Sequence, residues 1–241
     1  MLIENATVLV TGANRGIGAE FVRQLLHRGA RKVYATARNL ESIPNTGAEK
    51  IALDVTDEAQ VRELAARAGD VTLLINNAGV SSGADLLDGE LDAIRGELET
   101  NLFGPLHLTR AFAPILAANG GGGILNVLSA AAWFSAPGAT SYALSKAAAW
   151  SLTDATRVQL ASQGTQVTGL LMALVDTDMT AAVDAPKSSP SAIVTAALDG
   201  FEAGAHEITA DDLTAGIKAQ LHREPAVRYG DLIAPVRTMQ G

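Results

Sequence analysis

The sequence predicts an α/β fold in which helices cover both faces of one parallel sheet. Short apolar runs alternate along the chain with longer segments whose apolar residues recur at helical spacing. This alternation is typical of β-α-β units, whose right-handed crossovers distribute the helices over both faces. The 23 glycines among 241 residues suit the tight turns between strands and helices. We therefore expect a doubly wound Rossmann-type three-layer sandwich with a central parallel sheet of about seven strands.

Seven segments have the length and composition of buried strands. In chain order they are Thr7–Val10, Lys32–Ala37, Lys50–Leu53, Val71–Asn76, Gly123–Leu128, Gln166–Leu171 and the short His206–Thr209. In open α/β sheets, ligands bind beyond the carboxyl ends of the strands. Residues directly after these segments are therefore the first candidates for a functional site.

Five segments between the strands have helical periodicity. We expect helices at about Ile17–Arg28, Asp57–Ala68, Leu91–Asn119, Tyr142–Ser162 and Ser191–Gly204. Ile17, Phe21 and Leu25 form an apolar stripe on the first helix, and Asp57 is suited to cap the second. The third should break near Gly104-Pro105, because glycine and proline interrupt helices.

The chain length suits one folded unit, so we expect a single Rossmann-type domain over residues 1–241. Residues 181–191 have no clear periodicity and contain Pro186 and Pro190. Such a segment near the site is typical of a loop that closes over a ligand. We therefore expect a mobile substrate lid at about residues 180–191.

Composition excludes several classes of function. The absence of cysteine rules out disulfides and thiolate metal sites, and the four histidines lack metal-ligand spacing, so we expect no metal. A net charge of −8 argues against a nucleic-acid partner. No run of ~18 apolar residues could span a membrane, and the N-terminus lacks a signal-peptide pattern. We therefore expect a cytoplasmic protein with no membrane partner.

The first predicted strand continues into Thr11-Gly12-Ala13-Asn14-Arg15-Gly16-Ile17-Gly18 and then into a helix. Glycines at this point let the backbone approach a phosphate, and the free N–H groups of the helix start favour an anion. A glycine-rich turn without a ligand is the alternative, but the position at the first strand-to-helix turn favours a dinucleotide. The cofactor-binding residues expected in this loop are Gly12, Asn14, Arg15, Gly16, Ile17 and Gly18.

The end of the second strand distinguishes between NADH and NADPH. An acidic residue at this position usually holds the ribose 2′-hydroxyl of NAD. Here Ala37 is followed by Arg38, and no carboxylate is present to repel a 2′-phosphate. Arg38, with Arg15 in the neighbouring loop, could pair with that phosphate, although Arg38 could also be a solvated surface charge. We therefore expect NADPH, or NADP⁺ in the reverse direction.

Asp54 and Val55 follow the third strand, where the adenine should lie. Asp54 could accept a hydrogen bond from the adenine amino group, or it could cap the helix that begins nearby. The sequence leaves both alternatives open, and we include both residues in the expected cofactor site.

Four motifs, with consistent order and spacing, resemble the short-chain dehydrogenase/reductase family in its single-domain, carbonyl reductase-like branch. They are the Thr11–Gly18 loop, Asn76-Asn77-Ala78-Gly79, Asn101, and the set Ser129, Tyr142 and Lys146. The similarity covers about residues 3–235. It implies a catalytic tetrad of Asn101, Ser129, Tyr142 and Lys146.

The resemblance also implies roles in cofactor binding and in assembly. Asn77, Ala78 and Gly79 would border the adenosine ribose. Tyr142 and Lys146 would contact the cofactor, with Lys146 on the nicotinamide ribose. The two long helices, at about residues 91–119 and 142–162, would form the interfaces of a homodimer or homotetramer.

One segment departs from the family pattern. The family commonly has Pro-Gly after the sixth strand, where this chain has Met172-Ala173. The Val-x-Thr that follows is kept as Val175 and Thr177, which should face the nicotinamide carboxamide. Loss of a rigid proline and a permissive glycine should alter this loop and with it the substrate range.

The residue types fit the reduction of a ketone, which needs a hydride from the cofactor and a proton for the oxygen. Tyr142 and Lys146 are one helical turn apart and share a face. A free phenol titrates near pH 10 and a nearby ammonium favours the phenolate, so we expect the pKa of Tyr142 to be lowered. Ser129 could donate a hydrogen bond to the substrate oxygen. Alone, each residue could be ordinary packing or surface; their joint spacing favours catalysis.

The residues expected around the substrate are apolar. They are Ala131, Trp133 or Phe134, Met172, Met179 and Val183. The alternative is that the aromatic and methionine side chains fill interior or subunit contacts. Only Lys187 could meet a charged substrate, so we expect an uncharged, hydrophobic ketone or aldehyde.

We therefore predict an NADPH-dependent oxidoreductase whose partner is a small carbonyl or alcohol substrate. One alternative is an alcohol dehydrogenase that acts mainly in oxidation. Another is a non-catalytic NADPH-binding sensor or scaffold, which would not need an intact tetrad. A sugar-nucleotide epimerase would need a longer C-terminal substrate domain.

Overall fold

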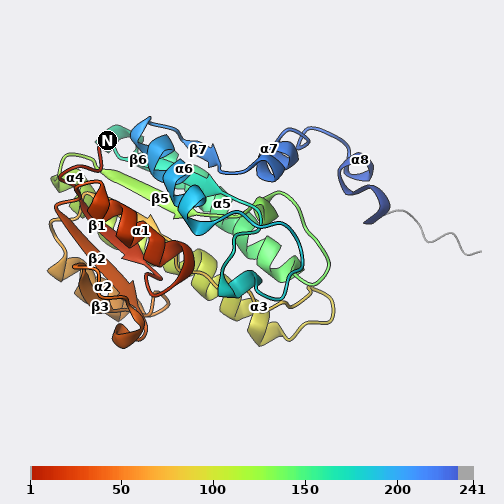
Figure 1. Cartoon of the computed structure of the whole chain (residues 1–241), viewed down its shortest axis with the longest axis horizontal. Helices are drawn as coiled ribbons and strands as arrows, with labels where there is room; N and C mark the ends of the chain where they lie inside the picture. The colour runs from red at the N-terminus through yellow and green to blue at the C-terminus, as the bar shows by residue number, and fades with distance from the viewer. Residues whose placement is uncertain (1, 233–241) are drawn as a thin grey trace, which may run out of the picture.

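The computed structural model describes residues 2–232 of the chain. Its centre is a seven-stranded parallel sheet with the order β3-β2-β1-β4-β5-β6-β7 (Figure 1). The strands are β1 (Thr7–Thr11), β2 (Lys32–Ala37), β3 (Glu49–Ala52), β4 (Leu73–Asn76), β5 (Gly123–Val127), β6 (Gln166–Leu171) and β7 (Glu207–Thr209). The strand order reverses between β1 and β4, which creates the crevice where such sheets bind ligands. The predicted doubly wound architecture is confirmed.

Helices cover both faces of this sheet. They are α1 (Gly16–His27), α2 (Glu58–Arg67), α3 (Leu91–Leu98), α4 (Gly104–Ala118), α5 (Thr140–Leu160), α6 (Pro190–Glu202), α7 (Asp212–Lys218) and α8 (Pro225–Tyr229). Helices α1 and α6 pack on one face, and α2, α4 and α5 on the other (Figure 1). Strand side chains alternate between the two cores: Val8 and Val10 point into the first and Leu9 into the second.

The expected strands and helices end within two residues of the observed boundaries, except at the long third helix. That helix does not break at Gly104-Pro105. Instead Glu99–Phe103 forms a π-helical turn, η2, between α3 and α4. A Cβ on Gly104 would lie 2.8 Å from Cγ2 of Val55, so glycine permits close packing there. Pro105 lies in the first turn of α4, where a missing N–H breaks no helical bond.

The sequence did not predict α7 and α8, because each is too short to show a helical period. They lie in a C-terminal arm, residues 211–232, which extends beyond one end of the sheet (Figure 1). Asp211 caps α7, and the Tyr229 ring stacks on Phe134 with the ring centroids 5.0 Å apart. Residues 233–235 of the family resemblance lie outside the described residues.

Within residues 2–232, no helix combines the length and the apolar character that a membrane crossing requires.

Candidate active site

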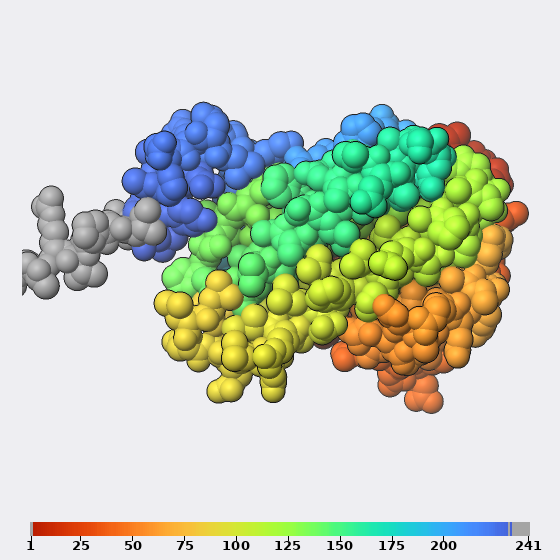
Figure 2. All heavy atoms as spheres, turned by 180° about the vertical axis from the view of Figure 1, so that it is seen from behind, coloured from red at the N-terminus to blue at the C-terminus, as the bar shows by residue number. Residues whose placement is uncertain are grey.

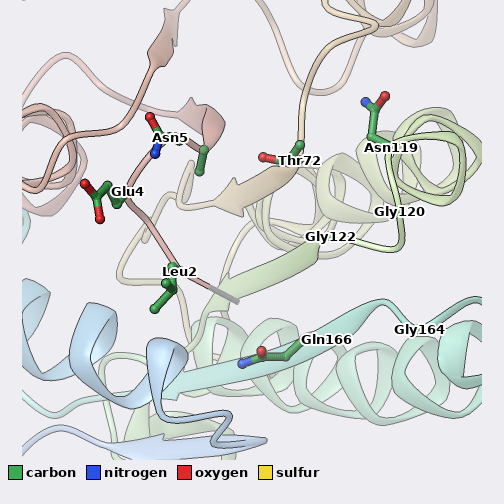
Figure 3. A pocket seen from close by; sticks show the side chains of 10 residues that line it. Leu2, Glu4, Asn5, Thr72, Asn119, Gly120, Gly122, Gly164 and Gln166 are labelled. Atoms are coloured by element: carbon green, nitrogen blue, oxygen red, sulfur yellow. The ribbon is translucent and has the colours of Figure 1, made fainter.

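The residues of the four motifs gather beyond the carboxyl ends of the central strands. A cavity of about 380 Å³ lies at the opposite end of the strands, where the chain enters β1, β4, β5 and β6 (Figure 3). Its lining includes Asn5, Thr72, Gly122 and Gln166, none of which belongs to a motif. The residues of the predicted site therefore lie at the carboxyl ends of the strands and not around this cavity.

The glycine loop is packed so closely that side chains cannot be added to it. Gly12 has a φ of +63°, and a Cβ there would lie 2.9 Å from Cα of Ala78. A Cβ on Gly18 would lie 2.1 Å from the carbonyl oxygen of Gly12, and one on Gly16 would lie 3.1 Å from Cγ2 of Thr177. Arg15, at the N-cap of α1, makes no side-chain cap. The uncapped N–H groups and the close backbone form a cradle suited to a phosphate anion.

Asn77 holds this loop in place. Its Nδ2 donates to the carbonyl oxygens of Thr11 at 2.8 Å and Gly12 at 3.1 Å. The Thr11 hydroxyl oxygen accepts from the backbone N–H groups of Asn77 and Ala78, at 3.0 Å each. The segment after β4 therefore fixes the loop after β1.

Arg38 and Arg15, the two arginines expected at the 2′-phosphate, differ in their ion pairing. Arg38 follows β2, is exposed, and makes no ion pair with any residue of 2–232. Nη1 of Arg15 lies 2.7 Å from Oδ2 of Asp178 in the segment after β6. Both of these side chains are mostly exposed, so the pair is weak and a phosphate could displace it. The sequence did not predict this partner for Arg15.

Asp54 neither caps α2 nor is buried. Its Oδ1 accepts from the N–H of Thr56 at 3.0 Å and from its hydroxyl at 2.8 Å. The cap of α2 is Asp57, which accepts from the N–H groups of Ala59 and Gln60, as expected. The capping alternative for Asp54 is therefore wrong, because a neighbouring carboxylate occupies that position. Val55 is buried against Gly104.

Ser129, Tyr142 and Lys146 come together from β5 and α5. Ser129 follows β5, and its Oγ accepts from the N–H of Ala131 at 3.1 Å. Tyr142 lies in the first turn of α5 beside Ser129, and Nζ of Lys146 lies 5.6 Å from the centre of its ring. The Lys146 ammonium is buried and donates to the carbonyl oxygen of Val127 at 3.1 Å.

Burial dominates the titration of this cluster. It raises the pKa of Tyr142 to about 12; a hydrogen bond with Ser129 opposes the rise, and the charge of Glu97 adds to it. Burial also lowers the pKa of Lys146 to about 8. The direction for Tyr142 is opposite to the expected lowering, because desolvation is the largest cause of its shift.

Asn101 is buried in the π-helical turn η2. Its Oδ1 accepts from the N–H of Val80 at 2.9 Å, and its Nδ2 donates to the Val80 carbonyl and to Oγ of Ser145, both at 2.9 Å. A Cβ on Gly79 would lie 3.2 Å from Oδ1 of Asn101 and 3.5 Å from Nζ of Lys146. Glycine at this position therefore lets Asn101 and Lys146 approach the segment after β4.

The expected substrate residues divide into two groups. Trp133 and Met172 are buried: Trp133 packs edge-on against Trp150, and Met172 belongs to the core under α1 and α6. This packing favours the alternative of interior contacts for both residues. Ala131 is partly buried, and Met179 and Val183 are exposed in the loop between β6 and α6.

The Met172-Ala173 segment is tied to the C-terminal arm. The N–H of Ala173 donates to Oδ2 of Asp211 at 2.8 Å, and the carbonyl of Met172 accepts from Ala130. Further along, Val175 pairs with Ser188 as a parallel bridge. The loop of residues 177–187 is therefore closed at its base, and Thr177 contacts the glycine loop.

Sequence reasoning missed three buried polar residues behind the site, which are Asn126, Thr153 and Glu97. Nδ2 of Asn76 donates to Oδ1 of Asn126 at 2.8 Å, and Nδ2 of Asn126 donates to Oγ1 of Thr153 at 2.9 Å. Glu97, on α3, is only 1% exposed. The signal for Glu97 was its spacing of three residues from the apolar Ile94 on a helix face.

Known proteins resemble this chain over most of its length. Residues 6–188 match the family model described as short chain dehydrogenase. An uncharacterized oxidoreductase of Staphylococcus saprophyticus is 26% identical over 220 residues, which cover 85% of this chain and 94% of that protein. A solved short chain dehydrogenase from Burkholderia cenocepacia J2315, in complex with NADP, is 39% identical, with a TM-score of 0.93 and coverage of 98% and 100%. Another solved protein, described as a short chain dehydrogenase/reductase family protein, is 29% identical, with a TM-score of 0.79 and coverage of 87% and 98%.

Proposed function

The chain belongs to the short chain dehydrogenase family of oxidoreductases, and on that premise we propose that it is an NADPH-dependent carbonyl reductase. Its substrates would be uncharged, hydrophobic ketones or aldehydes, which it would reduce reversibly to alcohols. The observation that carries this proposal is the convergence of Ser129, Tyr142 and Lys146 beside a glycine cradle.

The cradle and its surroundings support NADP(H) as the cofactor. The pyrophosphate would bind Gly12, Asn14, Gly16, Ile17 and Gly18, where the N–H groups of α1 are uncapped. Arg38 would pair with the 2′-phosphate, joined by Arg15 once its exposed bond to Asp178 is exchanged. Asp54 and Val55 would contact the adenine, and Asn77, Ala78 and Gly79 the ribose. The Burkholderia cenocepacia relative was solved with NADP.

Proton transfer would come from Tyr142. When bound, NADPH supplies a hydride to the carbonyl carbon, and the Tyr142 phenol gives its proton to the carbonyl oxygen. A pKa of about 12 keeps this phenol protonated at neutral pH, as a proton donor requires. Oγ of Ser129 accepts from the N–H of Ala131, so its hydroxyl proton, which bonds the Tyr142 oxygen in the protein alone, would turn to the substrate oxygen.

Lys146 would support the phenolate that remains after transfer. Its ammonium is charged below a pKa of about 8 and lies over the Tyr142 ring. The same group would bond the nicotinamide ribose. Asn101 would fix the segment after β4 against α5, through its bonds to Val80 and Ser145.

The loop of residues 177–187 supports the expected substrate lid of residues 180–191 within a single domain, although residues 190 and 191 form the start of α6. Met179 and Val183 expose apolar surface there, and Ala131 lies next to the catalytic serine. Val175 and Thr177, at the base of the lid, would face the nicotinamide carboxamide. Trp133 and Met172 would shape the pocket from behind.

A homodimer or homotetramer would bury the outer face of α4 and α5, which lie side by side in Figure 2. Phe103, Leu144 and Val158 are exposed apolar side chains of η2 and α5. Apolar residues repeated along exposed helices favour association over solvent exposure. Light scattering of the wild-type protein and of Val158→Glu would test this assembly.

The test of the function follows nicotinamide absorbance with NADPH or NADH against uncharged aryl and alkyl ketones. We expect NADPH oxidation by the wild-type protein and a loss of at least about a thousandfold in Tyr142→Phe, with NADPH binding unchanged. An active Tyr142→Phe variant would refute the role of Tyr142. Turnover only of alcohols with NADP⁺ would favour the oxidative alternative, and NADPH binding without any turnover would favour a sensor or scaffold.

A further inference from the structure

The first turn of α5, which carries Tyr142, has no cap of its own. Ala139 occupies the N-cap, and the first turn contains no acidic residue. The cap comes instead from Asp85, in the loop between β4 and α3. Its carboxylate accepts from the N–H of Gly138 at 2.9 Å and from the N–H and hydroxyl of Thr140 at 3.3 Å and 2.8 Å. These bonds, the one from Gly138 above all, lower the pKa of Asp85 and keep it charged against the positive end of the helix.

A second carboxylate reaches the same turn from α3. Oε1 of Glu97 accepts from the N–H of Ser82 at 2.5 Å and from its hydroxyl at 2.7 Å, and Oε2 accepts from the hydroxyl of Ser141 at 2.6 Å. Glu97 is 1% exposed and makes no ion pair with any residue in the described part of the chain. Burying a carboxylate without a cation is costly, and these three donors are its compensation.

Glu97 therefore connects three parts of the site. It lies one helical turn before Asn101, bonds the loop that follows Gly79, and bonds the residue directly before Tyr142. The N–H of Ser141 also donates to the carbonyl of Ala84 in the same loop, at 3.3 Å. The loop of residues 80–86 is thus held by hydrogen bonds to Glu97 of α3 and to the start of α5.

We propose that Glu97 is a positioning residue that fixes Tyr142 by joining the loop of residues 80–86 to the first turn of α5. The structural link stands on the hydrogen bonds alone, and its consequence for catalysis rests on the proposed function. A displaced phenol loses alignment with the substrate oxygen, and errors of about 1 Å in such groups can cost ~10²-fold in rate.

The charge of Glu97 has an effect separate from its geometry. The charged groups that face the start of α5 are Lys146 on α5 itself, Glu97 on α3 and Asp85 in the loop. Of these, the Glu97 carboxylate raises the pKa of Tyr142, which favours the phenol over the phenolate. Removing the charge while keeping the geometry should ease ionisation of Tyr142.

Two substitutions separate these effects. In Glu97→Ala the link through the carboxylate is cut: Ser82 loses its acceptor, and the Ser141 hydroxyl keeps only the Ala84 carbonyl. In Glu97→Gln the amide oxygen can still accept from Ser82, while the amide group donates to Ser141, whose hydroxyl can then donate to Ala84. Glu90→Gln is the matched control, because Glu90 is exposed at the start of the same helix and its side chain caps nothing.

Hydrogen exchange, followed by mass spectrometry, tests the link without any need for activity. We expect Glu97→Ala to speed exchange in peptides covering residues 80–86 and 138–146, and to leave α1 unchanged, whereas Glu90→Gln behaves as wild type. Unchanged exchange in Glu97→Ala would overturn the proposal. Faster exchange in a protein that reduces no ketone would uphold the link and refute the proposed function.

Kinetics then test the catalytic consequence. We expect Glu97→Ala to lower kcat by at least about tenfold with the Kd for NADPH within about twofold. We expect Glu97→Gln to retain ketone reduction at neutral pH and to shift the rise of alcohol oxidation to lower pH, since Tyr142 then ionises more readily. If Glu97→Ala does not fold, the shift in Glu97→Gln decides. An unshifted profile in Glu97→Gln, or an unchanged kcat in Glu97→Ala, would overturn the role of Glu97.

Discussion

Replacing Lys146 with methionine should stabilise the protein while abolishing turnover. The Lys146 side chain is 5% exposed, and within residues 2–232 its three donors find one protein acceptor, the Val127 carbonyl. Burial lowers its pKa from 10.5 to about 8. One pKa unit corresponds to 1.36 kcal/mol, so holding this charge at pH 7 costs about 3 kcal/mol of stability.

The pH dependence identifies the cause. Between about pH 8 and 10.5 the unfolded chain binds the lysine proton and the folded protein does not, so wild-type stability rises with pH across this window. Methionine carries no charge, and its advantage should therefore be greatest at pH 7 and about 2 kcal/mol smaller at pH 10. The unpaired Val127 carbonyl costs about 1 kcal/mol at both pH values and cancels in the comparison.

Urea unfolding at pH 7 and pH 10, followed by the fluorescence of Trp133 and Trp150, measures this difference. The control is Lys50→Met, whose ammonium bonds only the exposed Asn45 among described residues. If Lys146→Met gained the same stability at both pH values, or lost stability at pH 7, the desolvation argument would be refuted.

Three further outcomes follow from the site. Arg38→Ala should raise the KM for NADPH by about tenfold or more and leave that for NADH unchanged, because a charge-assisted phosphate bond is lost; equal effects on both cofactors would count against this role. Gly18→Ala should abolish NADPH binding and lower the melting temperature, since its Cβ would lie 2.1 Å from the Gly12 carbonyl, whereas Gly69→Ala, with open space around it, should do neither; tight NADPH binding by Gly18→Ala would disprove the packing argument. Ketone reduction, measured as kcat/KM from pH 6 to 10, should decline above about pH 8 as Lys146 loses its proton; a flat profile would show that its charge is not needed.

The fold could be predicted from the sequence because its strands are short apolar runs and its helices repeat apolar residues at a period of 3.6. The glycine positions were predictable for a similar local reason, since Gly12 and Gly16 follow the first strand directly. The helices α7 and α8 of the C-terminal arm could not be predicted, because short exposed helices show no helical periodicity in the sequence. An interruption near Gly104 was expected, but its position at Glu99–Phe103 and its π-helical form were not, and the close packing of Gly104 on Val55, which follows β3, is a contact between distant segments.

The site was predictable only in its residue identities. The spacing of Tyr142 and Lys146 indicated a shared helix face, but the direction of the Tyr142 pKa depends on burial, which spacing does not reveal. The partner of Arg15, Asp178, lies 163 positions away in the sequence, and the Glu97 link joins segments that meet only in the folded chain. The burial of Trp133 and Met172 could not be predicted, because apolar side chains near a site have the same sequence signature as core.

The paired amides of Asn76 and Asn126 have a consequence for how the chain avoids misfolding. The two residues are directly opposite in the β4–β5 ladder, among apolar neighbours. A slip of β5 by one residue would place Leu125 or Val127 opposite Asn76 and bury an amide without its partner, at a cost of about 1–3 kcal/mol. Apolar strands alone would tolerate such a shift in alignment far better. The amide pair therefore discriminates against mispaired sheets, and with them against a displaced Ser129, which follows Asn126 by three residues.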